Sequence, residues 1–209
     1  MKKLCILFAL GSLTTVPASA GTLSVRVTDP SGKPVEGAVV IVRPVGRAAP
    51  APRALGGLVV AQKGLQFHPL VSLVPLGSTV SFPNFDRVRH HVYSFSPAKR
   101  FELKLFASDQ TRSVTFDKPG VVAIGCNIHD RMSAFLYVSD SAWSAVSGVA
   151  GVASIGGLPG GAVSVTVYHP WLRAPGNVAV QQLALSGGAQ GLTVPIRLRP
   201  PPPMMMSGY

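Results

Sequence analysis

Short runs in which hydrophobic and polar residues alternate follow one another along this chain, and turn-forming residues separate them. Every second residue is Leu or Val between residues 22 and 28, and a second apolar run follows at residues 35–42. The intervening segment Asp29-Pro30-Ser31-Gly32 has the composition of a tight turn. A period of two predicts β-strands, because successive side chains of a strand point to opposite faces of a sheet.

The same pattern continues to the end of the chain. Further strands are expected at residues 59–60, 70–74, 79–82, 92–95, 101–105, 114–116, 121–124, 134–138, 163–168, 178–185 and 192–198. Residues 44–57 are rich in Pro, Ala and Gly and are interpreted as a linker, whereas residues 141–161 are rich in Ser, Gly and Ala and end in a turn. With 22 Gly and 19 Pro, long helices are disfavoured. The sequence therefore predicts an all-β protein of the β-sandwich class.

The first 20 residues have the pattern of an export signal. Lys2 and Lys3 precede an apolar stretch at residues 4–13, and Ala18-Ser19-Ala20 has the small-residue form of a cleavage site. A short membrane anchor is the alternative, but ten apolar residues are too few to span a bilayer. We predict cleavage after Ala20, a periplasmic location and no stable insertion in the membrane.

Export changes the interpretation of the charge. The chain carries +11, and loss of the two N-terminal lysines lowers its 19 Lys and Arg residues to 17 against 8 Asp and Glu, which leaves +9. An exported protein does not routinely meet nucleic acid, so no nucleic-acid partner is expected. The excess of basic residues favours an acidic partner protein, although an acid-poor chain can also be charged in this way without a partner.

One segment concentrates metal-binding side chains. Loss of Cys5 with the export signal leaves Cys126 as a lone thiol, which cannot form an intramolecular disulfide. His129 and Met132 follow it at intervals of three residues, in a loop expected after the strand at residues 121–124. A thiolate, an imidazole and a thioether together suit copper, which cycles between Cu(I) and Cu(II). A Met in the core is the alternative for Met132.

A second imidazole comes from a distant segment. Residues 84–93 begin with a polar turn and lead into an expected strand that starts with His90 and His91. Adjacent residues of a strand face opposite sides, so only one of these two histidines can face the metal. Two imidazoles, one thiolate and a weak axial thioether form the ligand set of a blue-copper centre.

The two segments, residues 84–95 and 119–132, resemble the metal loops of the cupredoxin family, of the amicyanin and plastocyanin type. The C-x-x-H-x-x-M spacing and an Asn six residues before the histidine carry this resemblance. It extends to exported bacterial proteins of the methylamine-utilization type. The resemblance implies a Greek-key β-sandwich with one mononuclear type 1 copper site, whose ligands would be His90, Cys126, His129 and the axial Met132.

The resemblance also assigns supporting residues around that site. Asn84 matches the Asn of the first metal loop, whereas His91 stands where the family commonly has an Asn that ties the two loops together. We expect either a hydrogen bond from His91 across the loops or an amide from Asn127 beside the sulfur.

The ends of the chain resemble a different family. The strand, the Asp29-x-x-Gly32-x-Pro34 turn and the following Gly37-Ala38 strand resemble the start of a transthyretin or carboxypeptidase-regulatory sandwich, and residues 163–170 resemble its later part. The expected divisions are an export signal at 1–20, outer strands at 21–43, a linker at 44–57, a copper domain at 58–139, outer strands at 140–199 and a Pro/Met-rich tail at 200–209. The copper domain is either inserted in the outer sandwich or packed beside it; two separate small β-units are the alternative.

The function predicted from these features is single-electron transfer by a periplasmic copper protein that is not an enzyme. Copper handling without electron transfer and a metal-free structural module are the alternatives. The sequence contains no paired catalytic acid and base, nucleophile elbow or nucleotide fingerprint. His68 and His169 lack partners at ligand spacing and are expected to be structural or exposed. The three methionines at 204–206 are expected in an extended tail, with Cu(I) binding as the alternative.

Overall fold

The computed structural model of the protein describes residues 21–200, in which the regular structure consists of β-strands and one short 3-10 turn. The prediction of an all-β chain built from β-sandwiches is confirmed. The expected export signal and all but the first residue of the expected Pro/Met-rich tail lie outside the described residues. Within the described part, none of the helical structure is long and apolar enough to cross a membrane.

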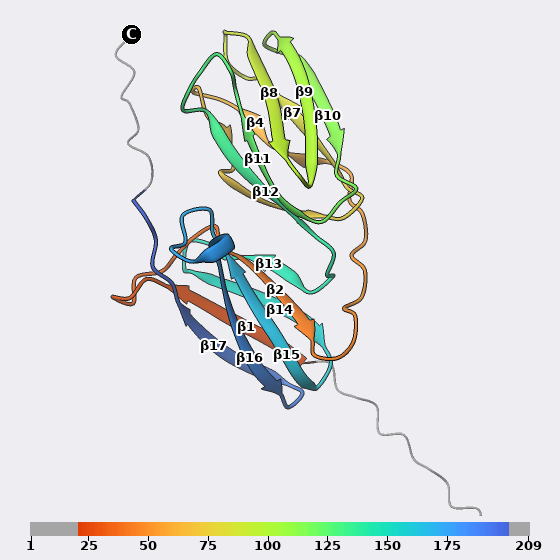
Figure 1. The fold of residues 1–209 in the computed structure, drawn as a ribbon, viewed down its shortest axis with the longest axis vertical. Helices are drawn as coiled ribbons and strands as arrows, with labels where there is room; N and C mark the ends of the chain where they lie inside the picture. Colours follow the sequence, from red (N-terminus) through yellow and green to blue (C-terminus); the bar gives the residue numbers. More distant parts are fainter. Residues whose placement is uncertain (1–20, 201–209) are drawn as a thin grey trace, which may run out of the picture.

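The strands form two sandwiches, which Figure 1 shows one above the other. The lower one, here called the flanking sandwich, packs a three-stranded sheet of order β14-β1-β17 against a four-stranded sheet of order β13-β2-β15-β16. Its strands are β1 (Gly21–Thr28), β2 (Val39–Pro44), β13 (Ser144–Val146), β14 (Val152–Leu158), β15 (Gly161–Tyr168), β16 (Val178–Leu185) and β17 (Ala189–Pro195), with the 3-10 turn η1 at Pro175–Asn177.

The upper one, here called the central sandwich, uses the residues between β2 and β13. A five-stranded sheet of order β6-β12-β11-β8-β9 faces a three-stranded sheet of order β10-β7-β3, and β4 and β5 form a separate two-stranded pair. Its strands are β3 (Leu58–Val59), β4 (Ala61–Gln62), β5 (Phe67–His68), β6 (Val71–Pro75), β7 (Thr79–Pro83), β8 (His90–Ser96), β9 (Lys99–Phe106), β10 (Thr111–Thr115), β11 (Gly120–Gly125) and β12 (Ser133–Ser139).

Each sandwich has a core of its own, as the alternation of the sequence requires. In β1 the Leu and Val residues at every second position are buried, and they join β15 side chains such as Val163 and Val165 in the flanking core. Phe82, Phe106 and Phe116 are fully buried in the central core. Burial of such aromatic side chains supplies much of the driving force for folding a small sandwich.

The two sandwiches also share an apolar contact. Val39 and Ile41 of β2 and Tyr168 of β15 form a buried cluster with Val71 of β6. The ring of Tyr137 in β12 lies with its centroid 5.2 Å from that of Tyr168. These contacts join an outer face of each sandwich, so β6 and β12 are covered on the side away from the central core.

Several strands differ from the expected ones. The segment interpreted as a Ser/Gly/Ala-rich turn region contains β13 and β14, and β14 pairs with β1. β2 begins at Val39 and not at residue 35, because Gly37 has φ 76° and turns the backbone. β17 runs parallel to β1 and ends at Pro195, after which the Ile196 N–H donates to the Thr28 carbonyl over 2.8 Å.

Candidate metal centre

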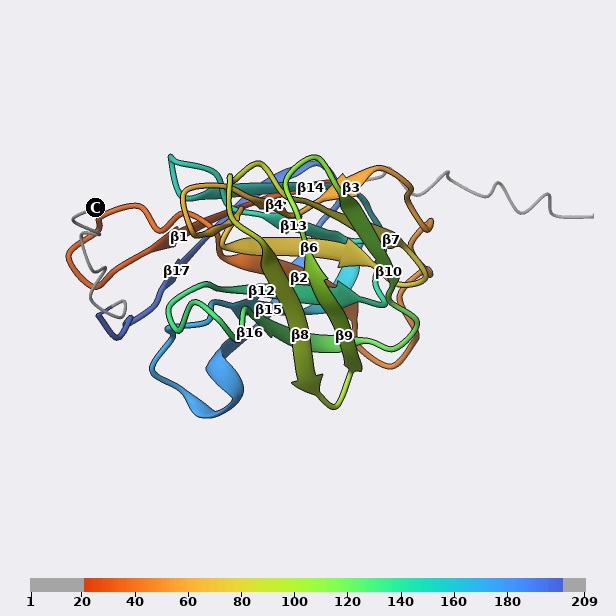
Figure 2. The same cartoon turned by 90° about the horizontal axis from the view of Figure 1, so that it is seen from above.

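The topology of the central sandwich brings the two donor-rich loops to the same edge. β8 starts at His90 and β11 ends at Gly125, and these neighbouring strands are antiparallel, with Gly125 opposite Tyr93. The start of one antiparallel strand and the end of its neighbour lie side by side. Cys126 follows β11 directly and therefore lies next to His90, although 36 residues separate the two in the chain. Figure 2 shows β8 beside β9, seen from above.

Three donor atoms converge at this edge. His129 Nδ1 lies 3.5 Å from Cys126 Sγ, His90 Nδ1 lies 4.0 Å from the same sulfur, and the two Nδ1 atoms are 3.2 Å apart. In the described residues this is the His/Cys/Asp/Glu group with the spacing of a metal site. His90 and Cys126 are buried, whereas His129 is partly exposed.

The triangle of donors has the size that a metal ion needs. A triangle with sides of 3.2, 3.5 and 4.0 Å has its centre about 2.1 Å from each corner, within the range of about 2.0–2.3 Å for imidazole and thiolate bound to a first-row metal ion. Two imidazoles and a thiolate also match the chemistry that copper and zinc prefer. The residues present therefore fit a metal ion of this kind.

Hydrogen bonds of the backbone shape the loop that carries Cys126 and His129. The Cys126 N–H donates to the Met132 carbonyl over 3.1 Å, and the Met132 N–H donates to the His129 carbonyl over 2.9 Å. These bonds close residues 126–132 into a tight loop. Met132 is 2% exposed and belongs to the same core cluster as Cys126.

The two adjacent histidines of β8 face different partners. His90 faces Cys126 and His129, whereas Nε2 of the His91 ring is hydrogen-bonded to the Glu102 carboxylate over 2.8 Å. The His91 backbone N–H points at Cys126 Sγ over 3.5 Å. The bond across the two loops that was expected from the side chain of residue 91 is thus made by its backbone, and Asn127 is exposed.

Asn84 organises the loop before β8. It is buried; its amide donates to the carbonyls of Val88 and Phe106, and its oxygen accepts the N–H of Asp86. An Asn that bonds to the backbone on both sides fixes a turn that has no ladder of its own.

Asp86 is a part of the site that the sequence argument did not identify. Its carboxylate lies 2.8 Å from His90 Nε2 and accepts the N–H groups of Gly64 at 2.7 Å and Leu65 at 3.0 Å. Burial favours the neutral acid, but the bonds from Leu65, His90 and Gly64 outweigh it and lower the pKa of Asp86. In the sequence, Asp86 could be connected to the site only by its place four residues before His90. Its other partners, Gly64 and Leu65, lie in the turn of the separate β4-β5 pair.

The Asp86 carboxylate fixes the tautomer of His90. An ionised carboxylate only accepts, so His90 Nε2 must carry a proton and Nδ1 is left with its lone pair toward the cluster. Carboxylate–imidazole pairs of this kind orient metal-binding histidines. The pKa of His129 is lowered mainly by burial and next by the neighbouring His90, and the Asp86 charge opposes this effect. A lowered pKa keeps the His129 ring neutral and able to bind a metal ion.

The remaining histidines and two of the basic residues lie elsewhere. His68 is exposed and bonds to the Lys63 carbonyl, and His169 is buried in the flanking sandwich. Arg100 and Lys99 pair with Phe95 and Ser96 at the end of β8, five and six residues from His90, or about 17–20 Å of strand. Arg87 and Arg89 are exposed in the loop between β7 and β8, and Arg131 is exposed in the loop between β11 and β12.

Fold and site together define a class: an all-β protein of two sandwiches with a largely buried cysteine–histidine cluster at one edge. No protein-family model and no curated protein matches the sequence.

Similar solved structures are cupredoxins and a copper enzyme, in each case over part of the chain. A purple cupredoxin from Nitrosopumilus maritimus is 21% identical over 40% of this chain and 100% of its own, with a TM-score of 0.36. Amicyanin from Paracoccus versutus is 20% identical over 40% of this chain and 81% of its own, with a TM-score of 0.37. A copper-containing nitrite reductase from Thermus scotoductus is 26% identical over 55% of this chain and 28% of its own, with a TM-score of 0.38. At these scores the similarity is partial, and the methylamine-utilization resemblance stays a prediction.

Proposed function

We propose that the protein binds one copper ion at His90, Cys126 and His129, with Met132 as the axial ligand, and carries single electrons in the periplasm. The observation that carries this proposal is the triangle of two Nδ1 atoms and one Sγ atom, whose size and chemistry fit copper. When bound, the ion supplies a centre that alternates between Cu(I) and Cu(II).

The residues of the chain hold the donors in fixed positions. Asp86 holds the His90 ring, and the His91 N–H donates to the sulfur and lowers its electron density. The sheet and the hydrogen bonds of the 126–132 loop resist changes in geometry, which keeps the energetic cost of changing redox state small. With Met132 as a fourth ligand no position is open for a substrate, so we propose a carrier and not an enzyme.

Electrons would pass at the partly exposed His129 ring. Ile128 in the same loop and Phe85 and Val88 in the loop before β8 are exposed apolar residues, and Arg87 and Arg89 are exposed next to them. Such a surface favours brief contact with an acidic redox partner. Raising the ionic strength should therefore slow transfer, and a stopped-flow rate that does not depend on salt would exclude this partner.

The deciding experiment is an absorption and EPR spectrum of the copper-loaded protein beside Cys126→Ser and His68→Gln. We expect an intense sulfur-to-copper band that Cys126→Ser abolishes and that the matched control His68→Gln retains, because His68 lies outside the cluster. Tight copper binding without this band would favour copper handling. Absence of bound metal after expression with export would favour the structural module.

A further inference from the structure

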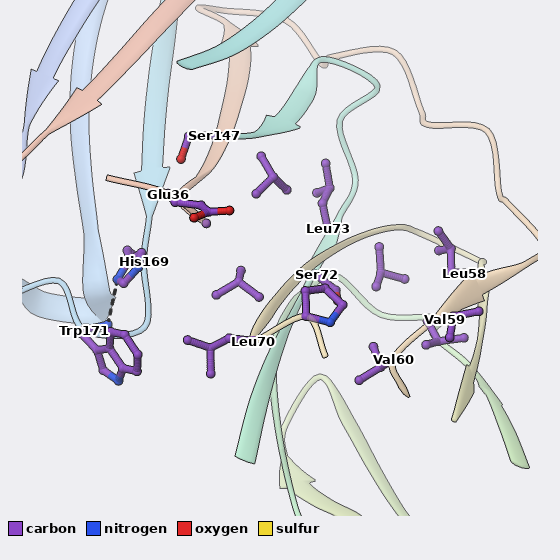
Figure 3. A pocket seen from close by; sticks show the side chains of 16 residues that line it. Glu36, Leu58, Val59, Val60, Leu70, Ser72, Leu73, Ser147, His169 and Trp171 are labelled. Carbon is purple, nitrogen blue, oxygen red and sulfur yellow. Dashed lines mark hydrogen bonds between the residues drawn. The ribbon is translucent and has the colours of Figure 1, made fainter. Parts of the chain in front are cut away.

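Two hollows meet at the boundary between the sandwiches, away from the donor cluster. The first has a volume of about 600 Å³ and is lined by β3 and β6 of the central sandwich and by loops of the flanking sandwich (Figure 3). Its walls are mainly aliphatic and include Leu58, Val59, Leu70 and Leu73. Glu36 is the charged residue of this lining, so most of the surface offers a ligand only apolar contact.

The second hollow is cationic. It has a volume of about 580 Å³, and its lining includes four basic residues, Lys33, Arg173, Arg197 and Arg199. All four are exposed, and within the described residues none of them forms a direct salt bridge, although Lys33 is attracted electrostatically to Asp29. The opposing carboxylates are those of Asp29 and Glu36, and Asp29 already accepts three hydrogen bonds from its own turn.

Glu36, His169 and Trp171 line both hollows and therefore mark the point where they join. His169 is buried there, and its Nδ1 accepts the Trp171 backbone N–H over 3.3 Å, as the dashed line in Figure 3 shows. The ring also bonds to the Glu36 backbone. These bonds fix the two segments against each other, so the junction is formed before any ligand arrives.

We propose that this continuous cleft binds an amphipathic anion, namely a free long-chain carboxylate. The apolar chain would lie against Val59 and Leu70 in the first hollow, where burial of its surface provides the binding energy. The carboxylate would lie among the arginines of the second hollow, which form bidentate bonds with such a group. An apolar channel that opens onto unpaired guanidinium groups is complementary to both ends of this ligand at once.

The charge of Glu36 distinguishes binding at this cleft from nonspecific binding to an apolar surface. Its exposed carboxylate lies at the junction and would repel the ligand's head group. Glu36→Gln should therefore tighten the binding of a long-chain carboxylate and weaken the binding of a long-chain cation of equal length.

Isothermal titration of the purified protein with dodecanoate and with dodecyltrimethylammonium tests the proposal. We expect dodecanoate to bind one to one and more tightly than the cation. Val59→Glu should weaken dodecanoate binding about ten-fold or more, because it places an unpaired charge in the apolar hollow. Val59 is 49% exposed, so the fold tolerates the change, and Val149→Glu, at a residue 79% exposed outside the cleft, is the matched control.

A second pair of variants tests the cationic end. Arg197→Gln with Arg199→Gln should weaken dodecanoate binding about five-fold, whereas Arg112→Gln on β10 should leave it unchanged. Equal binding of the cation and the carboxylate, or no effect of Val59→Glu, would overturn the proposal. It would also be overturned if the full chain failed to bind dodecanoate while a chain ending at Arg199 bound it, because the C-terminal segment would then be the occupant.

Discussion

Replacing Asp86 with Asn separates its two proposed effects, bracing the loop and orienting His90. The carboxylate accepts three N–H groups, from Gly64, Leu65 and His90. The amide oxygen of Asn can accept on one side only, and its NH₂ group then faces a donor on the other. Either the Gly64 N–H loses its acceptor, or the Leu65 N–H and the His90 ring both do, and the negative charge is lost in both cases.

The size of the effect follows from these contacts. Losing a hydrogen bond to a charged group, with a donor left unsatisfied, costs about 2 kcal/mol. For a protein of this size that corresponds to a fall of about 1 M in the midpoint of urea unfolding without metal. An Asn whose NH₂ faces His90 Nε2 would also shift the ring proton to Nδ1, the atom that faces the cluster. Copper affinity should fall about 10- to 100-fold, as it does when such outer partners are removed.

The assays are urea unfolding of the metal-free protein and competition for copper against a chelator. Asp109→Asn is the matched control, because Asp109 is exposed and has φ 63°, a conformation that Asn adopts readily. If Asp86→Asn lowers stability but leaves copper affinity within two-fold of the parent, the carboxylate braces the loop only and the tautomer argument is wrong.

The remaining predictions concern the flanking sandwich. Gly151→Ala should lower the unfolding free energy by about 2 kcal/mol or more, because Gly151 has φ 70° and an added Cβ would lie 2.5 Å from the Val27 carbonyl oxygen. Thermal denaturation measures this loss of stability. Gly148→Ala is the control and should change stability little, because an added Cβ there meets nothing within 4 Å. Burial lowers the pKa of His169 against the opposing bond to Glu36. The unfolded chain therefore binds the proton more tightly, and unfolding free energy should fall as the pH falls below about 6.5. Denaturation series at several pH values should show a smaller fall in His169→Gln, and equal slopes would refute the assignment.

The strands were predictable where apolar residues alternate, and the prediction failed where small residues replace them. β1 and β15 follow directly from their Leu and Val spacing. β14 reads Val-Ala-Ser-Ile-Gly-Gly-Leu, a composition with weak strand preference, and it forms a strand because β1 offers an unpaired edge. Pairing with a distant strand is a tertiary effect that no local window contains.

The surroundings of the candidate site were less predictable than its donors. Asp86 depends on a turn of the β4-β5 pair, and Glu102 reaches His91 from β9. Lys99 and Arg100 follow His90 closely in the sequence, but the β8-β9 hairpin places them opposite the far end of β8. In each case proximity along the chain differs from proximity in space.

The sequence by itself determined which donors are available: a C-x-x-H-x-x-M loop after a strand, and two adjacent histidines at the start of another. It also determined that only one of those histidines can face the cluster, since neighbouring strand residues point to opposite sides. The tertiary structure decided that His90 is the one, through the register that sets β8 beside β11 and brings Nδ1 to 4.0 Å from the sulfur. That register depends on the packing of the whole central core, because hydrogen bonds between strands are alike in every register and only side-chain packing distinguishes one from another.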